Sequence, residues 1–244
     1  MMTSGGLERK KWRKLARRVR LFRFVPFVDF ILVAGSMATG QVHEKSDFDV
    51  IVGVRQGRIF TARFFAAAFF QLFGWRRSKL DEKLEASDKI CMNHFVTPRN
   101  YRLSPPYNKY WHNLYQNVVP VLGKEQAIAD FLKANDWLTP ARSYPASPPA
   151  GGFRGASKSD PRYLGEARSS LKSFLEWFLG GRFGGGIEKI LRKDQVKRIE
   201  SGLPHSLGYK PRFIYNDDEL EFHPDTSRIE EVLRKLDRGA PSNL

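Results

Sequence analysis

The sequence contains very little cysteine and no long uninterrupted apolar run. Cys91 is the single cysteine among 244 residues, so the chain cannot form an internal disulfide framework. The two most apolar stretches, 24–40 and 59–75, are broken by polar or charged residues and are shorter than the roughly 20 residues of a membrane span. The basic N-terminus has no recognisable secretory signal. These absences predict a cytoplasmic chain without a transmembrane segment.

Acidic residues are scarce relative to basic ones. The chain has 41 Lys and Arg residues against 26 Asp and Glu residues, which gives a formal net charge of +15 at neutral pH. This excess favours polyanionic partners such as RNA, nucleotide phosphates or an acidic membrane surface, without choosing among them. Hydrophobic residues make up 41% of the chain, enough to bury a core, so the composition excludes a disordered protein.

The basic segment 7–24 is predicted to form an amphipathic helix. Trp12, Leu15, Val19 and Phe22 recur in it at steps of three and four residues, with Arg and Lys between them. Two interpretations follow from this pattern. The helix either binds a polyanion, or it packs on the core through its apolar stripe and simply exposes its charged face to water.

Short apolar runs at 28–34, 48–54 and 89–97 predict three β-strands. A nearly continuous apolar stretch at 59–73 predicts a helix that is buried on all sides. The remaining expected elements are helices at 107–117, 123–137, 162–179, 187–199 and 227–236, and a hairpin at 213–222.

Composition divides the chain into three parts. Residues 1–140 are expected to form a core, 141–161 a linker rich in Pro, Ser and Gly, and 162–244 a mainly helical C-terminal segment. The expected fold class is α/β (α+β), a mixed sheet flanked by helices. The glycine-rich run Gly180–Gly186 lacks the ending of a phosphate-binding loop, so it is predicted to be a flexible connection between two helices.

Two aspartates one residue apart, Asp47 and Asp49, open the second predicted strand. Because strand side chains alternate, both point to the same face, where unpaired carboxylates are costly. Oxygen ligands at this spacing suit a hard cation such as Mg²⁺. Gly35 and Ser36 follow the first strand, where glycine lets the backbone approach a phosphate and the serine hydroxyl can bind it. The alternative is a surface pair that forms salt bridges with neighbouring basic side chains.

An apolar strand ending in Gly35-Ser36, a spacer of about ten residues and then Asp47-x-Asp49 within a second strand resembles the nucleotidyltransferase superfamily typified by DNA polymerase β. The wider order of elements resembles uncharacterised prokaryotic members. The resemblance implies a nucleotidyltransferase-like mixed sheet, a nucleoside triphosphate as substrate, and up to two Mg²⁺ ions held by Asp47 and Asp49. It also implies transfer of a nucleotidyl group to a hydroxyl acceptor that the motif does not identify.

Members of that family add a third carboxylate from a later strand, but the predicted strand at 89–97 contains no Asp or Glu. Asn93 is the closest polar candidate for a metal ligand there, with Glu85 and Asp88 as alternatives in the preceding loop. The missing carboxylate favours an alternative function. In that alternative, a catalytically weakened protein of the same fold binds nucleic acid, nucleotide or a protein partner.

Several basic side chains lie near the predicted strands. Arg58 and Arg63 flank the start of the helix after the second strand, and Arg76 and Arg77 follow its end, so each could bind nucleotide phosphates. Alternatively, each is solvated or pairs with a local acid. His94 has two interpretations, a functional side chain or a semi-buried histidine with its hydrogen bonds satisfied. His43, in the spacer, either contacts substrate or is simply exposed. A third hypothesis is a membrane-surface protein that binds through the basic N-terminal helix.

Overall fold

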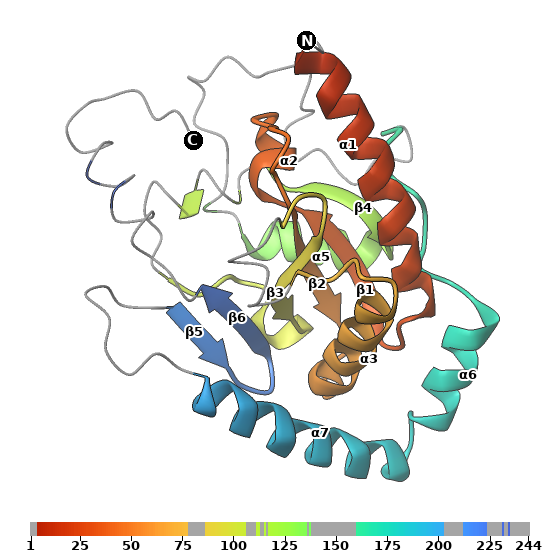
Figure 1. Ribbon diagram of the computed structural model, residues 1–244. Helices are drawn as coiled ribbons and strands as arrows, with labels where there is room; N and C mark the ends of the chain where they lie inside the picture. Colours follow the sequence, from red (N-terminus) through yellow and green to blue (C-terminus); the bar gives the residue numbers. More distant parts are fainter. Residues whose placement is uncertain are drawn as a thin grey trace.

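A computed structural model of the chain describes residues 4–77, 86–105, 111–112, 115, 117–135, 137, 160–202, 212–223, 231 and 234. Its centre is a six-stranded mixed sheet with the strand order β4-β1-β2-β3-β6-β5. Helices cover the sheet on both faces (Figure 1). The expected fold class, a mixed sheet flanked by helices, is confirmed.

β1 (Val28–Val33) and β2 (Phe48–Val54) form an antiparallel pair in the sheet. Every residue of β1 is buried, and β2 is buried except at Asp49. Near-continuous apolar runs suit strands that are covered on both faces, which is why the sequence pattern predicts both strands correctly.

α3 (Ile59–Leu72) connects β2 to β3 (Ile90–Val96), and the two strands are parallel. A parallel pair requires such a crossover connection. Both elements agree with the prediction from the apolar and β-branched runs. The expected burial of α3 on all sides is wrong, however, because Ala66 and Phe70 face the core whereas Phe64 and Leu72 are exposed.

α1 (Ser4–Val19) continues into the 3₁₀ helix η1 (Arg20–Phe24), close to the predicted helix over 7–24. Leu15, Val19 and Phe22 of the predicted stripe are buried in the core. The opposite face exposes four arginines, Arg9, Arg13, Arg17 and Arg20. The apolar stripe therefore packs as expected, and the structure leaves the charged face accessible to a partner.

Alternate residues of β2 divide the core into two layers. Val50 and Val52 point to the face covered by α1 and α3. Ile51 points to the opposite face, which is covered by α5 (Glu125–Ala134). In Figure 1, α3 lies in front of the sheet and α5 lies behind it. Asp49 has the same parity as Ile51, so its side chain belongs to the α5 side.

The strand β4 (Val119–Gly123) was not predicted from the sequence. It pairs antiparallel with β1 at the edge of the sheet, where Pro120 is tolerated. The predicted helix over 162–179 is half wrong, since only α6 (Ser170–Phe178) is helical. The preceding residues run beside β4 instead, and Leu164 N donates a hydrogen bond to a β4 carbonyl at 2.8 Å.

α7 (Arg182–Ser201) begins inside the glycine-rich run Gly180–Gly186. The prediction of a flexible connection is therefore wrong for this run, except at Gly180 and Gly181. A Cβ atom at Gly184 would lie 1.7 Å from the Leu179 carbonyl oxygen. The glycine thus allows the end of α6 to sit directly against the first turn of α7.

The predicted hairpin is confirmed as β5 (Arg212–Tyr215) and β6 (Glu219–His223), and β6 pairs with β3. Residues late in the chain therefore complete the sheet that the N-terminal residues begin. Almost all of the linker predicted over 141–161, and most of the helices predicted at 107–117 and 227–236, lie outside the described residues. The division into a core over 1–140 and a segment over 162–244 stays a prediction.

Candidate metal and nucleotide site

Asp47, Asp49 and Cys91 lie together where β2 and β3 begin. Asp49 pairs with Cys91 across the two parallel strands, and Asp47 directly precedes β2. One ligand atom from each of the three lies within 4.8 Å of the others, and all three residues are half-buried. The structure therefore brings the two predicted aspartates together and places a thiol beside them.

The backbone at Gly35 closes one side of this cluster. Gly35 begins α2 (Gly35–Thr39) directly after β1 and has a φ of +64°. A Cβ atom here would lie 2.4 Å from Oδ2 of Asp49, so glycine is needed both for the conformation and for the space. The expected tight turn at Gly35 and Ser36 is a short helix instead. It still presents the glycine backbone to the Asp49 carboxylate.

Arg77 compensates part of the negative charge. Its Nη1 donates to Oδ2 of Asp47 and lies 3.9 Å from Sγ of Cys91. Burial lowers the pKa of Arg77, but the Asp47 carboxylate and, after it, Cys91 raise this pKa by more than burial lowers it. The pKa of Arg77 is therefore raised overall, and the guanidinium stays charged. Desolvation, followed by Asp49 and Asp47, raises the pKa of the Cys91 thiol well above its usual range. The two carboxylates offer oxygen atoms of the kind that bind a hard cation.

Asn93 does not hold the position opposite the aspartates. Cys91 pairs with Asp49, and the register shifts by one residue between this pair and the next. Asn93 lies between Cys91 and His94, where the register shifts, and it is not paired with either aspartate. Its role as a metal ligand stays a prediction. Of the two alternatives, Asp88 pairs with two lysines of α1, one at 3.1 Å, and Glu85 lies outside the described residues.

Arg58 and Arg63, the predicted nucleotide ligands, lie apart from the two aspartates. Arg58 follows the far end of β2 and donates to the Gly180 carbonyl at 2.8 Å. Arg63 projects from α3, and its Nη1 donates to Oε1 of Gln195 on α7 at 2.6 Å. Burial, followed by repulsion from Arg76, lowers the pKa of Arg63 to about 10. Both arginines connect the core to its C-terminal helices.

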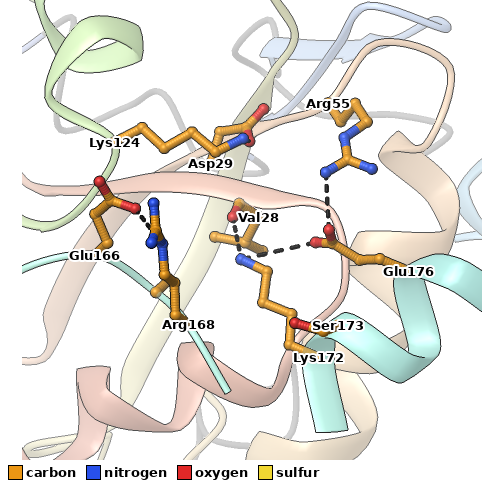
Figure 2. A pocket seen from close by; sticks show the side chains of 10 residues that line it. Val28, Asp29, Arg55, Lys124, Glu166, Arg168, Lys172, Ser173 and Glu176 are labelled. Atoms are coloured by element: carbon orange, nitrogen blue, oxygen red, sulfur yellow. Dashed lines mark hydrogen bonds and ion pairs between the residues drawn. The ribbon is translucent and has the colours of Figure 1, made fainter. Parts of the chain in front are cut away.

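A cavity of about 360 Å³ lies at the opposite end of β1 from the aspartates, and Figure 2 shows the charged side chains in its wall. Lys124 pairs with Asp29 at 2.6 Å, and Arg55 pairs with Glu176 at 2.8 Å. Lys172 donates to a β1 carbonyl at 2.5 Å, and burial lowers its pKa to about 8. Because these groups already satisfy one another, the cavity is a weaker candidate site than the aspartates.

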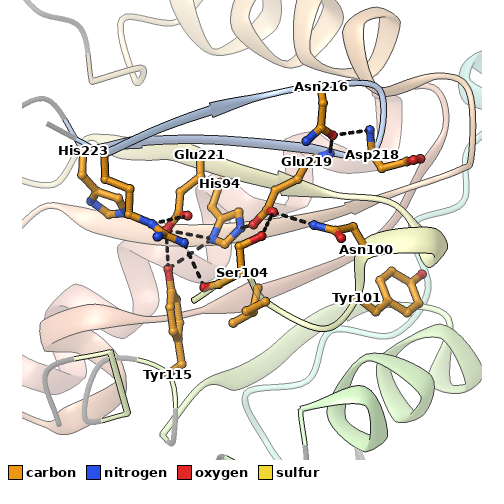
Figure 3. Close-up of polar contacts among 12 residues, drawn as sticks. His94, Asn100, Tyr101, Ser104, Tyr115, Asn216, Asp218, Glu219, Glu221 and His223 are labelled. Carbon is orange, nitrogen blue, oxygen red and sulfur yellow. Dashed lines mark hydrogen bonds and ion pairs between the residues drawn. The ribbon is translucent and has the colours of Figure 1, made fainter. Parts of the chain in front are cut away.

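A second acidic pair, Glu219 and Glu221, lies fully buried on β6 (Figure 3). Nε2 of His94 lies 3.0 Å from Oε1 of Glu219. Nδ1 of the same ring faces the Tyr115 hydroxyl at 3.2 Å and Glu221 at 3.9 Å. Arg212 Nε donates to the second oxygen of Glu221 at 2.6 Å. Protein groups therefore compensate both buried carboxylates.

The ligand atoms of His94, Glu219 and Glu221 lie within 4.8 Å of one another, as they would in a metal site. The two glutamates nevertheless face different nitrogens of the ring, so their oxygens do not converge on one nitrogen lone pair. Glu219 also accepts hydrogen bonds from Asn100 and Ser104 at 2.5 Å each. We interpret this cluster as a structural network that joins β6 to β3. His94 is thus the satisfied, buried histidine of the second interpretation.

Comparison of the chain with protein-family models, with curated proteins and with solved structures found no match. The resemblance to nucleotidyltransferases therefore depends on the Gly-Ser and Asp-x-Asp motif and on the local geometry around it. Family membership remains a hypothesis that the proposed chemistry has to test.

Proposed function

We propose that the chain is a Mg²⁺-dependent nucleotidyltransferase, which moves a nucleotidyl group from a nucleoside triphosphate to a hydroxyl acceptor. The observation that carries this proposal is the convergence of Asp47 and Asp49 beside the backbone of Gly35. A surface ion pair accounts for Asp47, which contacts Arg77. It does not account for a glycine at positive φ held directly against the Asp49 carboxylate.

The residues at the site fit the proposed chemistry. Asp47 and Asp49 offer carboxylate oxygens, which are the ligands that Mg²⁺ prefers in proteins. Mg²⁺ bound there would neutralise triphosphate charge and polarise the acceptor hydroxyl. Arg77 supplies a charged guanidinium beside the same carboxylates, suited to phosphate oxygens. Gly35 lets the backbone lie directly against the Asp49 carboxylate, and Ser36 is the next residue in the chain.

We propose a polyanion such as RNA as the acceptor, in the cytoplasm. The net charge of +15 and the four exposed arginines of α1 and η1 support this choice. These arginines are separated by three or four residues, so they share one face and are spaced by roughly 5–6 Å along the helix. Such a stripe can follow successive phosphates of a nucleic-acid backbone.

A second candidate function is nucleotide binding without transfer. It is favoured by the identity of the third side chain at the site, because the group beside the two aspartates is the thiol of Cys91 and not a carboxylate. A protonated thiol neither binds Mg²⁺ well nor activates a hydroxyl. The same site could then hold a metal-bound triphosphate and present it to a protein or nucleic-acid partner.

The test uses the full chain, Mg²⁺ and each nucleoside triphosphate labelled at its α-phosphate, with and without total RNA. Transfer is measured as labelled product, and binding is measured separately by calorimetry with a nonhydrolysable triphosphate before and after removal of Mg²⁺. Asp49→Asn removes one proposed ligand charge without changing the size of the side chain. Asp217→Asn is the matched control, because Asp217 is exposed and pairs with Arg192 at 2.6 Å, away from the site.

Transfer that requires Mg²⁺, is lost in Asp49→Asn and persists in Asp217→Asn supports the first proposal. Mg²⁺-dependent binding without transfer, with the same dependence on Asp49, supports the second candidate instead. A chain that neither binds nor transfers any nucleotide contradicts both.

A further inference from the structure

Helix α6 turns its polar face toward the protein. Glu176 accepts hydrogen bonds from the Phe27 amide at 2.7 Å and from the Arg55 guanidinium at 2.8 Å. Lys172 is buried and donates to the Val28 carbonyl at 2.5 Å, and Figure 2 shows both side chains reaching inward from the helix. Surface helices of globular proteins normally direct their apolar face inward. α6 has the opposite orientation.

Five large apolar side chains cover the outward face of α6 and the adjoining start of α7, and we call them the aromatic corner. They are Leu171, Phe174, Trp177, Phe178 and Phe183. Their exposed fractions range from 46% for Leu171 to 77% for Trp177. The rings of neighbouring members have centroids 5.1–6.3 Å apart, so they form one continuous surface.

The size of the aromatic corner restricts what can cover it. At about 150–250 Å² for each aromatic side chain, the corner exposes on the order of 500–600 Å². A continuous apolar patch of this size on a soluble protein is usually functional. A stable protein interface buries about 800 Å² on each partner, so the corner alone is too small for a stable dimer. The area favours a partner that needs no matching protein surface.

Charge around the aromatic corner identifies the chemistry of that partner. Residues 169–201, which contain α6 and α7, carry seven Lys and Arg residues against four Asp and Glu residues. Two of those acids, Glu176 and Glu188, are turned inward and accept backbone hydrogen bonds from the core. The exposed basic residues of α7 are Arg182, Lys189, Arg192, Lys193, Lys197 and Arg198, of which Arg192 and Arg198 also pair with acidic residues of the protein. Aromatic rings flanked by basic side chains suit the interface of an anionic bilayer.

We propose that the aromatic corner binds the surface of an anionic lipid bilayer. Trp177 and the neighbouring phenylalanines enter the headgroup region, and the basic side chains of α7 contact the lipid phosphates. Among the residues that the structure describes, no helix is both long enough and apolar enough to cross a membrane, so the contact is peripheral. This surface is separate from the aspartate site, and the proposal does not depend on nucleotidyl transfer.

The test is co-sedimentation of the full chain with vesicles of phosphatidylcholine, either alone or with about one third phosphatidylserine. The wild-type chain is expected to bind the anionic vesicles. Trp177→Glu removes apolar area and adds a repelled charge, so it should weaken binding by about 10-fold or more. Leu72→Glu is the matched control, because Leu72 is 79% exposed on α3 and should bind like the wild type. Both positions are exposed, and circular dichroism checks that both variants fold.

Three results would overturn the proposal. The first is a wild-type chain that does not bind anionic vesicles at low salt. The second is equal binding by Trp177→Glu and Leu72→Glu, particularly if Arg13→Glu with Arg17→Glu abolishes binding, which would place the contact on α1. The third is a wild-type dimer that Trp177→Glu converts to monomer without any vesicle binding, which would assign the aromatic corner to a second copy.

Discussion

Two acidic pairs with the same spacing lie on strands of the same sheet or directly before one, in very different surroundings. Asp47 and Asp49 are half-buried at the start of β2, next to a thiol, one arginine and the backbone of a glycine. Glu219 and Glu221 are fully buried on β6, and histidine, arginine, tyrosine and amide groups contact their oxygens.

The difference shows that the partners of an acidic pair, and not its spacing, determine its role. The buried glutamates are balanced by protein groups in place, so they contribute to holding the hairpin on the sheet. The aspartates are only half-buried, and they lie close enough together to share one cation. We therefore interpret the glutamate pair as structural and propose that the aspartate pair binds a cation. Substitutions in the two pairs and in their partners can test this division between a structural pair and a cation-binding pair.

Glu221→Gln is expected to have the largest effect on stability. It leaves Arg212 and His94 facing a neutral group in a buried site, and breaking a buried ion pair costs about 3–5 kcal/mol. Asp47→Asn breaks a half-exposed pair and should cost about 1 kcal/mol or less. Urea unfolding of both variants measures the two free energies. Equal losses would contradict the division.

A fall in pH below about 4.5 should destabilise the protein through the same network. Burial raises the pKa of Glu221, but His94, followed by His223 and Arg212, lowers it to about 2 from an ordinary 4.5. A lowered folded-state pKa gives stability that is present above pH 4.5 and is lost as the pH falls toward 2. The loss should reach about 3 kcal/mol at most. Urea unfolding between pH 6 and pH 3 should show a decline that is shallower in Glu221→Gln, and identical slopes would be inconsistent with this assignment.

Gly35→Ala should disrupt the aspartate site. The added Cβ atom would meet Asp49 Oδ2 at 2.4 Å, at a φ of +64° that alanine rarely adopts. Backbone strain alone should cost about 1–3 kcal/mol. Gly57→Ala is the matched control, because Gly57 has a φ of +71° and no atom within 4 Å of an added Cβ. Both variants should lose similar stability, but only Gly35→Ala should lose Mg²⁺-dependent nucleotide binding in calorimetry.

Arg77→Gln is expected to change stability least, by about 1 kcal/mol or less, because the side chain is one third exposed. Its removal frees Asp47 from its partner, so the affinity of the site for Mn²⁺ alone should increase several-fold. Arg76→Gln, which changes the neighbouring arginine, serves as the control. Titration with Mn²⁺, followed by electron paramagnetic resonance, measures both affinities. Unchanged Mn²⁺ affinity in Arg77→Gln would argue against a cation site at Asp47.

Local patterns in the sequence predict the central strands but not the edge of the sheet. β1, β2 and β3 consist of short apolar runs whose burial needs no knowledge of distant residues. β4 contains Pro120 and ends at Gly123, which obscures its strand pattern. The segment before α6 is extended because it bonds to β4, and helix propensity contains no information about such a distant partner.

The sequence predicts the candidate site only where its residues belong to a local pattern. Gly35, Asp47 and Asp49 belong to one short motif, so their convergence follows from two adjacent strands. Cys91 and Asn93 lie two residues apart on β3, and the pairing that places Cys91 beside Asp49 depends on the strand register, which the sequence pattern does not give. Two partners of Glu221, His94 and Tyr115, come from segments far away in the chain, so its burial and compensation could not be predicted from spacing.

The most direct test of the division is an anomalous-difference map from crystals of the wild-type chain soaked in Mn²⁺. Mn²⁺ takes the same carboxylate ligands as Mg²⁺ and is visible in such a map. The account predicts a peak in contact with the carboxylates of Asp47 and Asp49, and no peak in the network around Glu219 and Glu221. A peak between His94, Glu219 and Glu221, or none at the aspartates at saturating Mn²⁺, would contradict it.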